Sequence, residues 1–367
     1  MKQGMNRIDP TFAATLRRPD ELVARGLVSR ADLPELEKVA ARYAVAVTPD
    51  IAALIDTDDP ADPIARQFIP STEELITAPG ENADPIGDDA HSPVPGIVHR
   101  YPDRVLFKLV HVCAVYCRFC FRREMVGPGK ATAFSDDAYH AALDYIRSHD
   151  EIWEVILTGG DPLMLSPRRL CEIMTDLAAI DHVKIIRIHS RVPVADPARI
   201  TPEMVAALRV EGAVTWVAVH ANHPREFSAT ARAAVACLAD AGIPLVSQSV
   251  LLRGVNDDAA TLEALMRTFV ECRIKPYYLH HGDLAPGTAH LRTTIERGQE
   301  LMRGLRGRVS GLCQPEYVLD IPGGHGKAPI GPNYLSHANC AGGELSSEKK
   351  YRIVDYCGDV HLYPPTP

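Results

Sequence analysis

No part of this sequence reads as a membrane span or a secretion signal. Its apolar runs fall short of the roughly eighteen residues that a spanning helix requires, and residues 1–4 lead into polar sequence instead of an apolar signal core. Basic residues are also in deficit, since 39 Lys and Arg face 47 Asp and Glu, which disfavours an extended phosphate-binding surface. We therefore expect a cytoplasmic protein with neither a membrane nor a nucleic acid as partner.

A disulfide framework is missing as well. The nine cysteines are an odd number, and three of them fall within residues 113–120, a crowding that suits metal ligands in a reducing compartment. The other six are scattered, and small buried side chains are the default interpretation for Cys171, Cys237, Cys272, Cys313, Cys340 and Cys357.

Repeated βα units dominate the middle of the chain. Short β-rich apolar runs alternate there with amphipathic stretches, and after the first run they recur about every thirty residues, the length of one βα unit. The runs are 105–110, 152–157, 183–188, 214–219, 244–251 and 274–279. Helix-start residues precede the stretches between them, at Ser135, Ser166, Thr201 and Asn256. The pattern predicts an α/β fold, a partial (β/α)6 TIM-like barrel whose catalytic groups collect at the carboxyl ends of the strands.

The flanking segments differ from the repeating units. Residues 31–43 and 49–55 have helical patterns, and a connection rich in Pro, Asp and Gly follows at 79–96. After residue 309 the repeat stops and Gly- and Pro-rich sequence begins. We expect an N-terminal helical cap over 1–96, a barrel core over 97–309 and a C-terminal extension over 310–367.

The densest motif is a C-x3-C-x2-C arrangement directly after the first apolar run. It consists of Cys113, Cys117 and Cys120, on an expected loop at the carboxyl end of the strand. Three thiolates at this spacing can each bind a different iron of a four-iron cluster and leave the fourth iron without a cysteine. Three core cysteines, or a zinc site completed by His111, are the alternatives, although structural zinc usually shows two separated pairs of ligands.

Polar residues and glycines stand near the ends of the later strands. Gly159 and Gly160 let the backbone approach a ligand, and Asp161 can accept a hydrogen bond from an ammonium group. A tight turn with a helix cap is the alternative for these three residues. Further polar groups at strand ends or within strands are Ser190, Arg191, His220 and Gln248. Because parallel strands end at one edge of a sheet, we expect these groups to share a site.

The cysteine spacing, with the aromatic Phe119 before the third cysteine, resembles the radical S-adenosylmethionine superfamily. The resemblance implies that S-adenosylmethionine binds the free iron, where an electron cleaves it to methionine and a 5′-deoxyadenosyl radical. It also implies cofactor-binding roles for the strand-end residues Gly159, Gly160, Asp161, Ser190, Arg191, His220 and Gln248.

A closer resemblance spans almost the whole chain and is to the lysine 2,3-aminomutase family. The segments that carry it read DTDDP at 56–60, SPVPG at 92–96, HRYPDR at 99–104, QSVLLRGVND at 248–257 and KPYY at 275–278. It implies that Lys327, in a Gly-rich C-terminal segment, binds pyridoxal 5′-phosphate as a Schiff base, with Arg100 and Tyr101 near that cofactor. His325 departs from the family, which usually has glycine there.

The same resemblance implies the substrate contacts. Arg122 matches the position that binds the α-carboxylate, while Asp283 and Asp320 match the carboxylates that hold the distal ammonium of L-lysine. Two acids around one cation would discriminate against a neutral or anionic side chain. The expected reaction is migration of the α-amino group of L-lysine to give β-lysine, with a reducing donor such as flavodoxin or ferredoxin supplying electrons to a homo-oligomer.

Two alternatives and one departure accompany this expectation. The first alternative is a 2,3-aminomutase that acts on another amino acid, such as arginine. The second is a non-catalytic regulatory protein that keeps the iron–sulfur cluster without turnover. Clostridial members have a C-terminal zinc site, but here Asp258 stands where the first zinc cysteine would be, and the chain ends before the later ones. We therefore expect no structural zinc.

Overall fold

The computed structural model describes residues 14–126, 135–337 and 350–364. Its centre is a nine-stranded sheet whose strands follow one another in chain order. The strands are β1 (Ile97–Tyr101), β2 (Arg104–Val110), β3 (Glu154–Gly159), β4 (Ile185–Ser190), β5 (Val214–His220), β6 (Leu245–Val250), β7 (Lys275–His280), β8 (Glu316–Asp320) and β9 (Lys327–Pro329). Strands β2 to β8 are parallel, whereas β1 and β9 pair antiparallel at the two edges.

All six predicted strands are present, as β2 to β7. They were recognisable because parallel strands of this kind carry short runs of apolar residues. In β3, for example, the four central residues of EVILTG are all buried. The sheet curls into a partial barrel, so the predicted fold class is confirmed.

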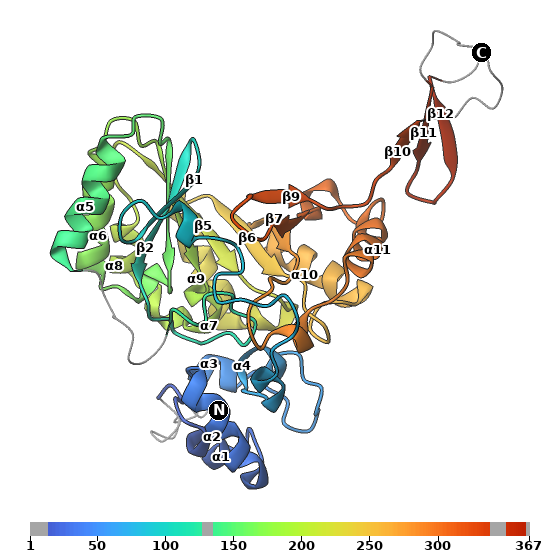
Figure 1. The fold of residues 1–367 in the computed structure, drawn as a ribbon, viewed down its shortest axis with the longest axis horizontal. Helices are drawn as coiled ribbons and strands as arrows, with labels where there is room; N and C mark the ends of the chain where they lie inside the picture. Colours follow the sequence, from blue (N-terminus) through green and yellow to red (C-terminus); the bar gives the residue numbers. More distant parts are fainter. Residues whose placement is uncertain (1–13, 127–134, 338–349, 365–367) are drawn as a thin grey trace, which may run out of the picture.

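Helices cover the outer face of the sheet (Figure 1). The longer ones are α5 (Asp136–Arg147), α6 (Pro167–Ala178), α9 (Ala229–Asp240), α10 (Ala259–Glu271) and α11 (Ile295–Leu305), with the short α7 (Val192–Ala195) and α8 (Pro202–Ala207) between them. Ser135, Ser166 and Thr201 accept the capping hydrogen bonds of α5, α6 and α8, as expected. Helix α10 begins later than predicted, because Asp258 caps it through Thr261 N.

The parallel sheet continues beyond residue 309, the point at which the sequence pattern of βα units stops. Helix α11 leads into β8, which pairs with β7, and β9 then turns back along β8 with Asp320 opposite Lys327. The five-residue β8 segment EYVLD is too short and too mixed to signal a strand by itself. The barrel thus has one parallel strand more than the six expected.

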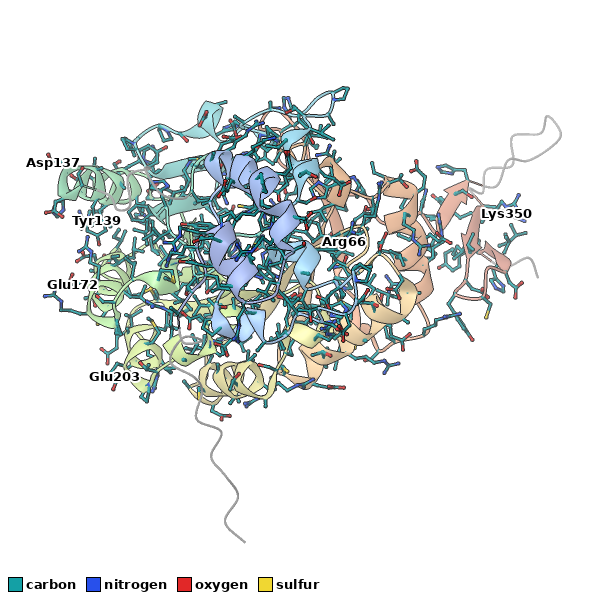
Figure 2. The ribbon with its side chains drawn as sticks, turned by 90° about the horizontal axis from the view of Figure 1, so that it is seen from below. Arg66, Asp137, Tyr139, Glu172, Glu203 and Lys350 are labelled. Carbon is teal, nitrogen blue, oxygen red and sulfur yellow. The ribbon has the colours of Figure 1, made fainter. Side chains whose placement is uncertain are left out.

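The N-terminal helices lie over the carboxyl ends of the strands. They are α1 (Pro19–Ala24), α2 (Leu33–Arg42), α3 (Pro49–Ala52) and α4 (Ala65–Phe68). Leu22, Ile51 and Phe68 from this segment form an apolar cluster with Val115 of the cysteine loop and Ala195 of α7. Figure 2 shows these helices across the middle of the molecule, near the labelled Arg66, with Asp137 and Glu172 out at the edge.

A separate three-stranded sheet projects from the body near the C-terminus (Figure 1). It consists of β10 (Leu335–His337), β11 (Tyr351–Val354) and β12 (Val360–Tyr363), all antiparallel. Within the described ranges no helix is long and apolar enough to cross a membrane.

The scattered cysteines only partly follow their expected burial. Cys272 and Cys313 are buried, as predicted, whereas Cys171, Cys237 and Cys357 are exposed, so the prediction is wrong for those three. Cys171 and Cys237 lie on the solvent faces of α6 and α9, where burial is not required. Cys340 lies outside the described residues.

Candidate functional site

One cavity inside the curled sheet brings together every residue predicted to form a site. Its walls include all three cysteines of the motif, the strand-end group, Lys327 and the expected substrate residues. The strand-end members are Gly159, Gly160, Asp161, Ser190, Arg191, His220 and Gln248, and the others are Arg100, Tyr101, Arg122, Asp283 and Asp320. The structure therefore brings these residues together in one cavity at the strand ends, and their binding roles stay predictions.

The paired glycines after β3 are required by a close approach of two backbones. Gly159 has a φ of +105°, and a Cβ there would lie 2.5 Å from Val110 O. A Cβ on Gly160 would overlap the carbonyl group of Val112, immediately before Cys113. The same contact includes hydrogen bonds from Gly160 N to Val110 O (2.5 Å) and from Asp161 N to Val112 O (2.9 Å). The glycines therefore fix where the cysteine loop begins.

Asp161 is satisfied by the protein itself. Its carboxylate accepts hydrogen bonds from Ser190 Oγ (2.8 Å), Arg191 N (2.7 Å), Val192 N (3.2 Å) and Leu163 N (3.1 Å). The bond from Leu163 caps a 3-10 helix, which is the helix-cap alternative raised from the sequence. Burial raises the pKa of Asp161, while these hydrogen bonds act in the opposite direction. Asp161 thus joins the ends of β3 and β4.

The cysteine loop carries three half-buried thiols that line the cavity. Burial raises the pKa of Cys113 well above its usual range and that of Cys120 to about 11. Thiols in such a place become thiolates only beside a compensating positive charge such as iron. Among the described residues no set of three or more His, Cys, Asp or Glu side chains surrounds a single ion position. A four-iron cluster does not need one, because each thiolate binds a different iron.

Buried ion pairs anchor the cysteine loop to the N-terminal segment. Arg118 donates from Nε and Nη2 to the two oxygens of Glu74, at 2.9 and 2.5 Å, and from Nη1 to Ala44 O at 2.8 Å. Arg123 also pairs with Glu74, which has no exposed surface. Burial alone would raise the pKa of Glu74, but the two arginines hold it below its usual value.

Lys327 lies at the edge of the cavity on β9. Its ammonium Nζ is 2.6 Å from Asp320 Oδ1, and its backbone N donates to Tyr101 Oη at 2.7 Å. The second oxygen of Asp320 is 3.3 Å from His280 Nδ1, and Gln248 Nε2 is 3.2 Å from His280 Nε2. Because the Gln248 amide donates to Nε2, His280 is neutral and its Nδ1–H donates to Asp320.

Asp283 differs from Asp320 in having no such partner. Its Oδ1 is buried and has no hydrogen-bond partner within the described parts of the chain. Burial and the nearby charge of Asp320 raise the pKa of Asp283 to about 7, while Lys327 and Arg122 act to lower it. Burial would also raise the pKa of Asp320, but its hydrogen bond from His280 and the charge of Lys327 hold it well below the usual range.

The carboxylate of Asp88 pairs with two arginines of the cavity. Arg100 Nη2 donates to Asp88 Oδ1 at 3.0 Å, and Arg122 Nη2 donates to Asp88 Oδ2 at 3.1 Å. The buried Lys108 adds a third positive charge to this group. Asp84 and Asp89 also act on Lys108, so the group combines three cations with several carboxylates.

Comparison with known proteins identifies the family. Residues 107–265 match the model of the radical SAM superfamily, and residues 302–341 match the model described as lysine-2,3-aminomutase. The L-lysine 2,3-aminomutase of Clostridium subterminale is 45% identical over 79% of this chain and 70% of its own. The chain belongs to the lysine 2,3-aminomutase family.

Other relatives show the range of that family. A putative L-lysine 2,3-aminomutase of Aquifex aeolicus is 41% identical over 91% of this chain and 89% of its own. The glutamate 2,3-aminomutase of Clostridioides difficile is 37% identical over 82% of this chain and 70% of its own. Among solved structures, a radical SAM methyltransferase of Sphaerobacter thermophilus has a TM-score of 0.43 and 19% identity, covering 61% of this chain and 68% of its own, too distant to bear on activity.

Membership of the lysine 2,3-aminomutase family makes the protein an isomerase of the radical SAM type. The superfamily match supports a four-iron cluster and S-adenosylmethionine as cofactors and a small molecule as substrate. The described site fits the cluster, because three half-buried thiols line one cavity and burial raises their pKa values, so their thiolates need a positive partner.

Several members of the site had not been recognised in the sequence. They are Asp88, Lys108, His189, His280 and Glu226, together with Gln67 behind the cysteine loop. His280 was within reach, because it ends β7 just as His220 ends β5. Asp88 and Gln67 could not be recognised, because they lie in irregular or short helical segments. The sequence of such segments does not indicate where they pack against the barrel.

Proposed function

We propose that this protein is a pyridoxal 5′-phosphate-dependent lysine 2,3-aminomutase that interconverts L-lysine and β-lysine. The observation that carries the proposal is the buried Asp283 Oδ1, which has no hydrogen-bond partner in the described ranges and lies near a second carboxylate, Asp320. Arg122 lines the same cavity. A diamino acid complements this arrangement, because it has a cation at one end and a carboxylate at the other.

The cofactors supply the difficult chemistry. When bound, the cluster and S-adenosylmethionine would supply radical chemistry, and pyridoxal 5′-phosphate would supply imine chemistry for the amino group. The protein's residues bind, orient and shield the reactants.

Lys327 is the proposed attachment point for pyridoxal 5′-phosphate. A lysine attacks an aldehyde as the free amine, and the 2.6 Å contact with Asp320 Oδ1 holds Nζ at the cavity wall. The backbone bond from Lys327 N to Tyr101 Oη holds β9 against β1, so the lysine stays in place when its side chain moves. Arg100 and Lys108, near Asp88, offer positive charge for a phosphate group.

Asp283 and Asp320 are the proposed clamp for the distal ammonium of lysine. In the structure Asp320 holds the Lys327 ammonium, which shows that this carboxylate accepts a primary ammonium at close range. His280 keeps hold of the other oxygen, so Asp320 can exchange one cation for another without turning. A substrate ammonium would also satisfy Asp283 Oδ1, which the protein leaves unpaired.

Arg122 is the proposed partner of the substrate α-carboxylate. Its guanidinium is nearly buried and is held by Asp88, which fixes the direction of the remaining donors. The bidentate geometry of arginine suits a carboxylate.

Arginine is the second candidate substrate, because its guanidinium would also satisfy two carboxylates. Glutamate is disfavoured, since its side-chain carboxylate would face Asp283 and Asp320 without compensation. A non-catalytic regulatory role would leave the unpaired Asp283 oxygen without a purpose.

Anaerobic reconstitution tests the proposal. Protein loaded with iron, sulfide and pyridoxal 5′-phosphate should convert L-lysine to β-lysine in the presence of S-adenosylmethionine and a chemical reductant, as measured by chromatography. Arginine and glutamate are assayed in parallel. Turnover of either in preference to lysine refutes the substrate assignment, and absence of 5′-deoxyadenosine with all three refutes the aminomutase proposal.

Asp320→Asn sharpens the same test. The variant keeps the shape of the side chain but removes the charge, so lysine turnover should fall by about 100-fold, in line with the loss of a buried charged partner. Binding of S-adenosylmethionine should change little, because Asp320 pairs with Lys327 and His280 rather than with the cysteine loop. Equal lysine kinetics in the variant and the parent would contradict the clamp.

A further inference from the structure

Arg191 was expected to bind S-adenosylmethionine; both of its terminal nitrogens donate to the protein, while its buried Nε has no partner among the described residues. It follows the last residue of β4, and its Nη1 donates to the sulfur of Cys117 at 3.1 Å. Its Nη2 donates to Gln67 Oε1 and to Glu226 Oε2, both at 2.6 Å. A cationic side chain thus connects a cluster cysteine to a buried carboxylate.

The pair is shielded from water. The Arg191 side chain is 6% exposed and that of Glu226 is 0% exposed. Solvent and salt screen such charges weakly, so the cysteine sulfur senses both the arginine and its counter-charge.

Glu226 is held in place by hydrogen bonds to its other oxygen. Its Oε1 accepts from Asn222 N at 2.8 Å and from His223 N at 2.9 Å, leaving Oε2 to face the arginine. Gln67 of α4 donates to the same Oε1 at 3.3 Å. The backbone carbonyl of Gln67 accepts from Arg118 N within the cysteine loop, so the N-terminal segment also contacts the ligand loop itself.

We propose that Arg191 sets the reduction potential of the cluster through Cys117, and that Glu226 sets how much of the arginine's charge the cluster senses. Reduction adds one negative charge to the cluster, which a nearby cation and a hydrogen bond to sulfur both stabilise. Glu226 opposes that effect. This inference depends on the cluster alone and not on which amino acid the enzyme rearranges.

The proposal predicts that replacing Arg191 and replacing Glu226 shift the midpoint potential of the cluster in opposite directions. Removing the cation with Arg191→Met should make the midpoint potential of the cluster more negative. Removing the counter-charge with Glu226→Gln should make it less negative, because the arginine then remains uncompensated. A purely structural role predicts instead that both variants admit water and shift the potential in the same direction.

The experiment is a redox titration of the anaerobically reconstituted enzyme, followed by the electron paramagnetic resonance signal of the reduced cluster. Arg191→Lys serves as the conservative variant: it keeps the charge, so its potential should lie between those of the parent and Arg191→Met. Arg267→Met is the matched control, because Arg267 pairs with Glu263 on the surface of α10 and its loss should leave the potential unchanged.

Three outcomes would overturn the proposal. These are unchanged potentials in both Arg191 variants, shifts of the same sign in Arg191→Met and Glu226→Gln, or an Arg191→Lys potential as low as that of Arg191→Met. If Arg191→Met fails to retain its cluster, Arg191→Lys should still be more negative than the parent and Glu226→Gln less negative, and any other order refutes the assignment.

Discussion

Two aspartates in the same cavity, Asp161 and Asp283, have opposite relations to the protein around them. Both have a pKa that burial raises above its usual value. Asp161 accepts four hydrogen bonds from neighbouring residues, whereas Asp283 has a buried oxygen with no partner among the described residues. The first acid is complete without a ligand, and the second is not.

The contrast distinguishes residues that hold the site together, such as Asp161, from residues that are available to bind a ligand, such as Asp283. The region around the cysteine loop is closed by fixed contacts, including the glycine turn after β3 and the ion pairs of Glu74. The region around Lys327 contains a carboxylate, Asp283, whose buried Oδ1 has no partner among the described residues and which an incoming cation would satisfy. A functional site commonly keeps such an unmatched group at some cost in stability.

The largest effect is expected at Lys327. Lys327→Ala removes the only amine proposed to bind pyridoxal 5′-phosphate covalently, so the imine absorbance should disappear while the iron–sulfur absorbance remains. Ultraviolet–visible spectroscopy of the anaerobically loaded protein measures both.

Lys38→Ala is the control for this substitution. Lys38 is exposed on α2, where it pairs with Glu35, and its loss should leave both absorbance bands intact. Retention of the imine band in Lys327→Ala would refute the attachment point.

The comparison of the two aspartates can be broken directly by replacing each with asparagine. Asp283→Asn should weaken lysine binding by about 100-fold, because the buried charge facing the ammonium is lost. It should not lower the stability of the free protein, since no hydrogen bond is removed. Isothermal titration calorimetry and urea denaturation provide the two measurements.

Asp161→Asn should behave in the opposite way. In this variant one carboxylate oxygen of Asp161 becomes an NH2 group, which faces backbone and hydroxyl donors and cannot accept their hydrogen bonds. The change should lower the free energy of unfolding by about 2 kcal/mol. If instead Asp161→Asn is as stable as the parent and loses binding of S-adenosylmethionine, Asp161 contacts the cofactor as first expected from the sequence.

The glycine turn provides a smaller, local test of the closed region. In Gly160→Ala the new methyl group would overlap the carbonyl of Val112, so the variant should lose about 2 kcal/mol of stability and bind less iron. Gly304→Ala is the matched control, because it lies in α11 with nothing within 4 Å of the added Cβ. Equal iron content in the two variants would show that the turn does not position the cysteine loop.

Elements marked by a local sequence pattern were predicted, whereas elements that depend on contacts with distant residues were not. The buried strands β2 to β7 were predictable because a parallel sheet requires apolar runs, and α5, α6 and α8 because a single capping residue marks each start. Strand β8 was missed, because five mixed residues gain their conformation from pairing with β7 rather than from their own pattern.

For the site, residue type could be predicted better than residue contacts. Arg191 was correctly expected at a strand end lining the cavity, but the direction of its guanidinium depends on Gln67 and Glu226. Those partners lie 124 and 35 residues away in sequence. Long-range contacts of this kind leave no local pattern, which is why Asp88 was also missed, whereas His280 at the end of β7 could have been recognised by its position.

The smallest expected effect is the pH dependence that Asp283 gives to lysine binding. In the free protein its pKa is about 7, raised by burial and by Asp320, with Asp88 adding to the rise and Lys327 and Arg122 opposing it. Below that pH the carboxyl group is protonated and must release a proton when it pairs with an ammonium. Lysine affinity should therefore rise by at most about tenfold per pH unit up to pH 7 and level off above it.

Folding stability should respond with the opposite sign. A carboxyl group whose folded pKa is raised contributes most at low pH, and that contribution is lost as the pH rises from about 4 through 7. Asp283→Asn cannot ionise, so it should lack both pH dependences. Calorimetry and urea denaturation between pH 5.5 and 8, roughly the range around this pKa, test the pair of trends. If the variant keeps the parent's slopes, a group other than Asp283 titrates, and the unmatched carboxylate is not what the substrate ammonium meets.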